Sequence, residues 1–261
     1  MSTHVLLLDA GNTRLKWAVL DSAQAQPGDA LALSESTCWL GQGAASYDAL
    51  ASLPALWQQW GYLATCVGVS VANEAIISAI EHRLNQLGLS ATWLAPSARA
   101  GGVQNGYLPA ESLGADRWAA LIAARQRTHE SALVISAGTA LTIDALDATG
   151  HFLGGMILPG RQMMRHALAH TTAQVGMQNG KVQTFPTTTA DAVETGLITA
   201  CTGAIATLRA DLETTSASPP RMFLTGGDGA SLRFFLPTGV TMVPGLVLEG
   251  VYYLSLEVRL L

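Results

Sequence analysis

The 261-residue chain has little charge and little cysteine. Charged residues make up 13% of it, and 14 Lys and Arg against 19 Asp and Glu give a formal net charge of −5 at pH 7. A general nucleic-acid-binding protein normally carries a basic face, so we expect no nucleic-acid partner. Cys38, Cys66 and Cys201 are odd in number, widely scattered and without CxxC spacing. This pattern argues against a disulfide framework and against a zinc site.

Long apolar runs are also absent. No run approaches the roughly 20 residues that span a bilayer, and the opening Met-Ser-Thr-His lacks the basic region of a secretory signal. We therefore expect a cytoplasmic protein without a membrane partner. Hydrophobic residues still make up 49% of the chain, enough for the cores of two moderate domains. Because so little of the chain is charged, we expect further apolar surface to be buried in a homodimer.

The most informative stretch is an apolar run that ends in a glycine-containing turn. Residues 5–8 (Val-Leu-Leu-Leu) predict a buried strand, residues 10–13 (Ala-Gly-Asn-Thr) a tight turn, and residues 17–21 the returning strand. Backbone N–H groups at such a tip can approach a phosphate, to which Lys16 adds a positive charge. Asp9, at the end of the first strand, can hold Mg²⁺ through water.

A degenerate copy of this hairpin follows half a chain later, at residues 133–147 (Leu-Val-Ile-Ser-Ala-Gly-Thr-Ala-Leu-Thr-Ile-Asp-Ala-Leu-Asp). With one gap, its Ala-Gly, Thr, Leu and final Leu-Asp match the first hairpin, and a Gly-Gly-Asp turn at residues 226–228 comes third. Two loops of one kind predict an α/β fold of two duplicated domains, residues 1–117 and 118–261, with a nucleotide cleft between them. The alternative is two unrelated hairpins with glycine turns.

A third signal is the run Leu-Gly-Ala-Asp-Arg-Trp at residues 113–118, where a helix is predicted to begin. Asp116 falls in the first helical turn, where the helix dipole favours an ionised carboxylate. An ionised Asp can accept the proton of a substrate hydroxyl as that oxygen attacks a γ-phosphate. Arg117 can fork onto a substrate carboxylate. The alternative is that Asp116 only stabilises its own helix.

The order of these motifs resembles that of type III pantothenate kinase, a family also called Bvg accessory factor-like, within the actin, sugar kinase and Hsp70 ATPase superfamily. The resemblance rests on residues 9–16 (Asp-Ala-Gly-Asn-Thr-Arg-Leu-Lys), Asn105-Gly-Tyr-x-Pro109, residues 114–118 (Gly-Ala-Asp-Arg-Trp), residues 137–140 (Ala-Gly-Thr-Ala) and Gly154-Gly-x-Ile-x-Pro-Gly160. It implies two duplicated actin-like ATPase (ribonuclease H-like) domains. It also implies ATP-dependent phosphorylation of pantothenate to 4'-phosphopantothenate, the first step of coenzyme A biosynthesis.

The resemblance implies roles for particular residues. ATP, accompanied by Mg²⁺, is expected to contact Asp9, Ala10, Gly11, Asn12, Thr13, Arg14, Leu15, Lys16 and Thr139. Pantothenate is expected to contact Tyr107, Gly114, Ala115, Asp116, Arg117 and Thr189, with Asp116 as the general base. The resemblance also implies a homodimer in which the partner subunit helps to close the pantothenate pocket.

One position departs from the family pattern. The family usually has Asp three residues before the Thr of the second hairpin, where it coordinates K⁺ or NH₄⁺, and this chain has Ser136. A hydroxyl lacks the charge that favours such a cation, so a site at Ser136 is expected to be weaker, differently built or absent.

Two rival functions stay open: a sugar kinase, and a regulatory nucleotide-binding protein that has lost catalysis. The small size of the chain argues against the first. The joint presence of Asp9, Lys16, Asp116 and Arg117 argues against the second.

Overall fold

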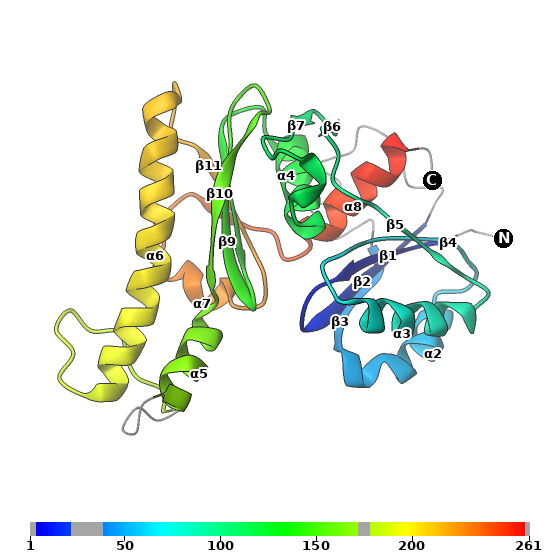
Figure 1. The fold of residues 1–261 in the computed structure, drawn as a ribbon, viewed down its shortest axis with the longest axis horizontal. Helices are drawn as coiled ribbons and strands as arrows, with labels where there is room; N and C mark the ends of the chain where they lie inside the picture. The colour runs from blue at the N-terminus through cyan, green and yellow to red at the C-terminus, as the bar shows by residue number, and fades with distance from the viewer. Residues whose placement is uncertain (1–3, 22–38, 172–177, 259–261) are drawn as a thin grey trace. The chain divides into compact units, whose positions relative to one another are not determined.

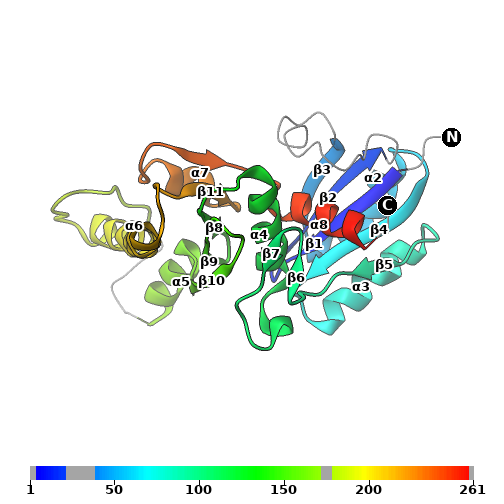
Figure 2. The same ribbon diagram turned by 90° about the horizontal axis from the view of Figure 1, so that it is seen from above.

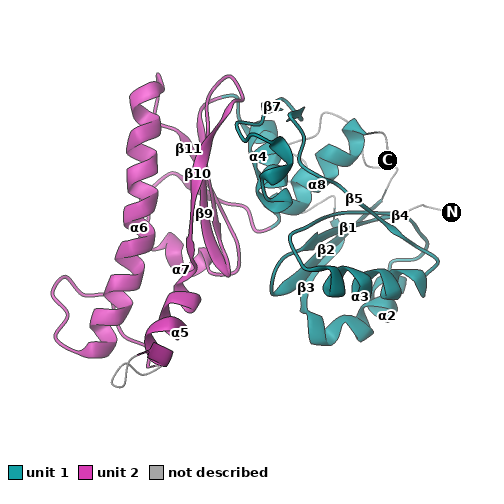
Figure 3. Ribbon diagram, viewed as in Figure 1, with its two compact units in different colours: residues 1–129, 245–261 teal, residues 130–244 magenta. Residues whose placement is uncertain are grey.

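The computed structural model describes residues 4–21, 39–171 and 178–258. The chain divides into two compact units, unit 1 with residues 1–129 and 245–261, and unit 2 with residues 130–244 (Figure 3). Across the described ranges, no helix is both long enough and apolar enough to cross a membrane.

Unit 1 is built on a five-stranded sheet with the strand order β3-β2-β1-β4-β5 (Figure 1). β1 pairs antiparallel with β2 and parallel with β4. The strands are β1 (His4–Ala10), β2 (Arg14–Asp21), β3 (Trp39–Ser46), β4 (Leu63–Ser70) and β5 (Ala91–Trp93), with a small separate pair β6 (Arg99–Ala100) and β7 (Val103–Gln104). The helices are η2 (Tyr47–Ser52), α2 (Leu53–Gln58), α3 (Glu74–Asn85), η3 (Ala110–Ser112), α4 (Ala115–Arg127) and α8 (Leu246–Glu257).

Unit 2 repeats this sheet, with the strand order β10-β9-β8-β11-β12. The first three strands in sequence pair antiparallel, and the last two add on in parallel, as in unit 1. The strands are β8 (Ala132–Ala137), β9 (Ala140–Leu146), β10 (Phe152–Pro159), β11 (Arg221–Thr225) and β12 (Val240–Met242). The helices are α5 (Arg161–Thr171), α6 (Thr189–Thr215) and α7 (Gly229–Arg233). The predicted duplication is therefore confirmed at the level of topology.

The central strand β1 is an apolar run because both of its faces are covered. On one face, Leu6 and Leu8 belong to a buried cluster with Trp57 of α2 and Ile80 of α3. On the other face α8 packs against β1 (Figures 1 and 2). A strand buried on both faces need not alternate polar and apolar residues, which is why residues 5–8 are continuously hydrophobic.

The pairing of α8 with α4 brings the end of the chain into unit 1. The two helices approach so closely that a Cβ added to Gly250 of α8 would lie 1.8 Å from the Ala119 carbonyl oxygen of α4. Arg127 at the end of α4 donates two hydrogen bonds, of 2.8 and 2.7 Å, to Glu249. The division seen in the structure thus differs from the expected boundary at 117/118, because α4 and α8 pack as one layer in unit 1.

We expect Gly250→Ala to destabilise the protein, because its methyl group must push α4 and α8 apart. Overpacking of this kind costs about 1–3 kcal/mol. Gly203→Ala is the matched control: Gly203 lies in α6, and its added Cβ meets no atom within 4 Å. That control should gain roughly 0.5–1 kcal/mol from helix propensity. Urea unfolding of both variants measures the contrast, and equal effects would contradict the packing described.

Candidate functional site

The first hairpin pairs a buried carboxylate with a lysine whose head reaches solvent. Asp9 of β1 lies opposite Lys16 of β2, and Lys16 Nζ donates to Asp9 Oδ2 at 2.9 Å. Asp9 is 3% exposed, whereas the Lys16 side chain is 37% exposed. Gly11 N donates to Arg14 O at 3.1 Å and closes the turn. Residues 12–14 are exposed, so the tip can meet a ligand while Asp9 stays inside.

Two of the residues expected to contact ATP lie inside the sheet. Ala10 and Leu15 are both 0% exposed, and they pair with each other across the strands. Their side chains are part of the core, so any contact with a nucleotide there would come from the backbone of the neighbouring turn.

Tyr47 fixes the same turn and was not predicted from the sequence. Its hydroxyl donates to the Gly11 carbonyl and lies 3.2 Å from the Arg14 carbonyl. Burial, and next the negative charge of Asp9, raise the pKa of Tyr47 to about 12. The hydroxyl therefore keeps its proton at neutral pH and remains a donor. No local pattern marks this residue, because its partners lie more than 30 positions earlier in the chain.

The start of α4 lies beside the carboxyl ends of β1 and β4. Val71, just after β4, donates its N–H to Ala10 O at 3.0 Å. A Cβ added to Gly114 would lie 3.7 Å from Val71 Cγ1 and 2.8 Å from Asp116 Oδ1. Glycine at position 114 therefore leaves room for the observed direction of the Asp116 side chain. Ligands of α/β sheets bind at this end of parallel strands.

Asp116 is a half-buried carboxylate in an environment that opposes its ionisation. Its pKa is raised, first by burial and next by the negative charge of Asp9. The N–H of Arg117, which donates to Asp116 Oδ1 at 2.8 Å, and the charges of Arg117 and Lys16 act in the opposite direction. The net effect makes Asp116 a stronger proton acceptor than an ordinary aspartate, which is the property a general base needs.

Tyr107 and Arg117, which the resemblance implies for pantothenate binding, lie in contact with each other. Arg117 Nη1 donates to the Tyr107 hydroxyl at 3.0 Å, and the guanidinium carbon lies 5.4 Å from the centroid of the Tyr107 ring. Asn105 shapes the approach, since its Oδ1 accepts the Tyr107 N–H at 2.9 Å. Unit 1 thus assembles the Asp9–Lys16 hairpin, Asp116, Arg117 and Tyr107.

The second hairpin has the same backbone without the charges. Ser136 takes the place in β8 that Asp9 takes in β1, and it lies opposite Thr142 of β9, where β2 has Lys16. Thr139 is exposed at the tip. Over residues 4–21, 39–171 and 178–258, no group of three or more His, Cys, Asp or Glu side chains is arranged to hold a metal ion.

The glycine turn after β11 packs directly on this hairpin. Gly226 has a φ of +96°, and a Cβ there would lie 2.2 Å from the Ala137 carbonyl oxygen. That oxygen accepts the Asp228 N–H at 3.0 Å. A positive φ and so close a backbone contact both require glycine. The turn predicted from the sequence therefore lies against Ala137, at the end of β8 in the second hairpin.

Thr189, the remaining residue implied for pantothenate, is the first residue of α6 and is exposed. The helix is capped by its neighbour Thr188, whose Oγ1 accepts the Asp191 N–H at 3.2 Å. Thr189 lies in unit 2, whereas Tyr107 and residues 114–117 lie in unit 1.

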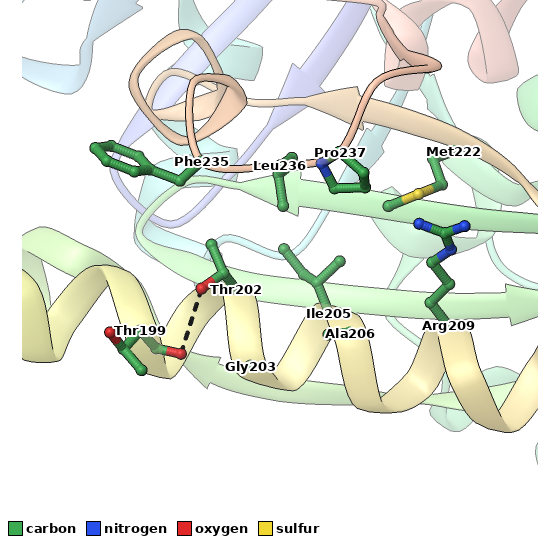
Figure 4. Close-up of a pocket in the computed structure, with 10 residues that line it drawn as sticks. All are labelled: Thr199, Thr202, Gly203, Ile205, Ala206, Arg209, Met222, Phe235, Leu236 and Pro237. Carbon is green, nitrogen blue, oxygen red and sulfur yellow. Dashed lines mark hydrogen bonds between the residues drawn. The ribbon is translucent and has the colours of Figure 1, made fainter. Parts of the chain in front are cut away.

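A hollow in unit 2 is separate from all of these residues. It lies between α6 and residues 235–237 and has a volume of about 280 Å³ (Figure 4). Its wall is mainly apolar, with side chains such as Ile205 and Leu236, and its cationic residue Arg209 is paired with Glu213 at 2.8 Å. None of the residues predicted to contact ATP or pantothenate lines it.

Comparison with known proteins gives a consistent result. The family model described as type III pantothenate kinase matches residues 5–211. The type III pantothenate kinase of Laribacter hongkongensis (strain HLHK9) is 38% identical over 261 residues, covering 96% of this chain and 98% of its own. That of Thiobacillus denitrificans (strain ATCC 25259 / T1) is 38% identical over 251 residues, with 96% of both chains covered.

Solved structures support the fold. A Baf family protein from Campylobacter jejuni matches with a TM-score of 0.61 and 21% identity, covering 98% of this chain and 100% of its own. The activator of 2-hydroxyisocaproyl-CoA dehydratase from Clostridium difficile matches with a TM-score of 0.53 and 13% identity, covering 98% and 96%. The predicted α/β fold of two duplicated actin-like domains is confirmed.

We expect Asp116→Asn to have a higher urea midpoint of unfolding than the parent protein at pH 8. The difference between the two midpoints should become smaller toward pH 5. Because the pKa of Asp116 is raised in the folded state, its contribution to stability is present at low pH and is lost as the pH rises through that pKa. Asparagine has no such loss. Urea midpoints at both pH values measure the gap. The exposed Asp211→Asn is the control, and a less stable Asp116→Asn at pH 8 would contradict the burial argument.

Proposed function

The chain belongs to the type III pantothenate kinase family, and we propose that it transfers the γ-phosphoryl group of ATP to the terminal hydroxyl of pantothenate. The single observation that carries the proposal at the level of residues is the environment of Asp116. This carboxylate lies at the start of α4, has a raised pKa, and is electrostatically coupled to the Asp9–Lys16 hairpin. A proton acceptor beside a phosphate-type loop is the arrangement that phosphoryl transfer to an alcohol requires.

On the nucleotide side, the first hairpin supplies the groups that recognise phosphate. The backbone N–H groups of residues 12 and 13 and the Thr13 hydroxyl donate hydrogen bonds to phosphate oxygens, and Lys16 adds its charge. Thr139 offers the corresponding hydroxyl on the second hairpin. Nucleotide binding by these particular residues is part of the proposal.

A divalent cation fits the donor set at Asp9. Mg²⁺ retains several waters and usually binds proteins through one or two carboxylates together with substrate phosphates. Asp9 offers a buried hard oxygen at the strand end, and its Oδ2 is already oriented by Lys16. When bound with ATP, Mg²⁺ neutralises phosphate charge.

On the acceptor side, Arg117 binds the carboxylate of pantothenate, and Tyr107 holds the guanidinium in place from one side. Thr189 offers a further hydroxyl from α6. The hydroxyl oxygen of pantothenate attacks the γ-phosphorus as its proton passes to Asp116. The new O–P bond forms while the bond between the γ-phosphorus and the β–γ bridging oxygen breaks, and ADP leaves.

We also propose that the protein is cytoplasmic and forms a homodimer, the latter because of its low charge and the family resemblance. The low number of charged residues, 13% of the chain, supports a further buried surface. Sedimentation equilibrium at micromolar concentration tests the dimer directly.

The function is tested by measuring ADP release with pantothenate, glucose, glycerol or no acceptor. We expect ADP release with pantothenate and none with glucose, glycerol or no acceptor. The turnover rate with pantothenate should fall by about 10²–10⁴-fold in Asp116→Asn, which removes the general base without changing the side-chain volume. The exposed Asp211→Asn, the same chemical change on α6, should keep parental turnover. Turnover with a sugar, or near-parental turnover in Asp116→Asn, would overturn the proposal.

The monovalent cation response should follow the charge at position 136. A carboxylate oxygen attracts a hard cation, whereas the Ser136 hydroxyl offers only a dipole. We therefore propose a weak K⁺ or NH₄⁺ response in this chain and a stronger one in Ser136→Asp. Initial rates against KCl, balanced with NaCl, measure it.

The control for this experiment is Ser218→Asp, which adds the same charge in an exposed loop and should leave the cation response unchanged. Steep, saturable activation of the parent protein by K⁺ would show that a carboxylate at position 136 is not needed.

A further inference from the structure

Unit 2 contains a chain of four alternating charges that was not predicted from the sequence. Arg161 donates from Nε and Nη2 to the two carboxylate oxygens of Asp228, at 2.9 and 2.7 Å. Its remaining nitrogen, Nη1, donates to Glu194 Oε1 at 2.7 Å. The other oxygen of Glu194 accepts a hydrogen bond from Arg165. Two cations and two anions make the group neutral overall.

This group is largely removed from water. Arg165 is 2% exposed and Glu194 is 7% exposed, and the side chains of Arg161 and Asp228 are mostly covered. Arg165 also donates to the Gln178 carbonyl at 3.0 Å. Buried ion pairs are weak contributors to net stability, because desolvation offsets much of their attraction. What they do supply is geometry, since a guanidinium that forks onto a carboxylate fixes both distance and orientation.

Arg161 is placed where three segments of the candidate site meet. The residue before it, Gly160, donates its N–H to the Thr139 carbonyl at the tip of the second hairpin, at 2.9 Å. Asp228 ends the glycine turn that packs on the same hairpin. Glu194 lies in α6, which begins at Thr189. The backbone of Arg161 thus follows the hairpin, while its side chain holds the glycine turn and the first turns of α6.

We propose that Arg161 is a positioning residue that holds the glycine turn and the start of α6 in fixed geometry against the second hairpin. The inference rests on the proposed function, because that function assigns the hairpin and the glycine turn to ATP and Thr189 to pantothenate. The Arg161 guanidinium then positions the segments of unit 2 that are assigned to the two substrates. Its bond to Asp228 fixes the glycine turn assigned to ATP, and its bond to Glu194 fixes the helix α6 that begins at Thr189.

The test compares Michaelis constants for the two substrates across charge-removing variants. Arg161→Gln should raise the KM for ATP and for pantothenate, each by about tenfold, the loss expected for a hydrogen bond to a charged group. Asp228→Asn should raise mainly the KM for ATP, and Glu194→Gln mainly that for pantothenate. Arg161→Lys, which keeps the charge but cannot fork, should fall between parent and Arg161→Gln.

A double variant tests whether the effect on ATP passes through Asp228. Arg161→Gln combined with Asp228→Asn should have a KM for ATP close to that of Arg161→Gln alone. The matched control is Arg221→Gln, which removes an exposed pair with Glu130 in the same unit. Arg221→Gln should leave the KM for ATP unchanged, both in the parent protein and in Arg161→Gln.

Binding of a non-hydrolysable ATP analogue, measured by titration calorimetry without pantothenate, separates this proposal from the proposed function. Weaker analogue binding by Asp228→Asn and Arg161→Lys supports the positioning role even if pantothenate proves not to be the acceptor. If these folded variants lose melting temperature but keep analogue affinity and both KM values within twofold of the parent, the network is structural and the proposal is wrong.

Discussion

A carboxylate buried at the end of a central strand is the constraint on which unit 1 depends. Asp9 is the last residue but one of β1, whose two faces are covered by α2 and α3 on one side and α8 on the other. Burying a charge there is unfavourable unless it is paired. The cross-strand position of Lys16 supplies the partner at 2.9 Å. The same negative charge of Asp9 raises the pKa of Asp116. The residue that Lys16 stabilises in the sheet therefore also raises the proton affinity of the proposed base.

The duplicated fold uses one backbone plan for two different tasks. Unit 1 places its charges at the hairpin, where Asp9 and Lys16 face each other. Unit 2 has hydroxyls at the equivalent positions, Ser136 and Thr142, and has a charged network around Arg161. Under the proposed function, unit 1 contains the proton acceptor, and the network of unit 2 holds the glycine turn and the start of α6 in fixed geometry.

The features predicted from the sequence are those that short-range patterns determine. Both hairpins and the helix that carries Asp116 follow from neighbouring residues. The return of α8 to unit 1, the hydroxyl of Tyr47 and the network of Arg161 were not predicted. Each depends on partners far along the chain, such as the 67 positions between Arg161 and Asp228, and no local periodicity encodes them.

The central claim is that burial and the charge of Asp9 raise the pKa of Asp116. Selective ¹³C labelling of aspartate carboxyls and a pH titration by NMR measure that pKa directly, in the parent protein and in Asp9→Asn. The account predicts a parental Asp116 pKa above the ordinary aspartate range and a lower value in Asp9→Asn, because one source of repulsion is removed. An Asp116 pKa in the ordinary range in the parent, unchanged in Asp9→Asn, would contradict it.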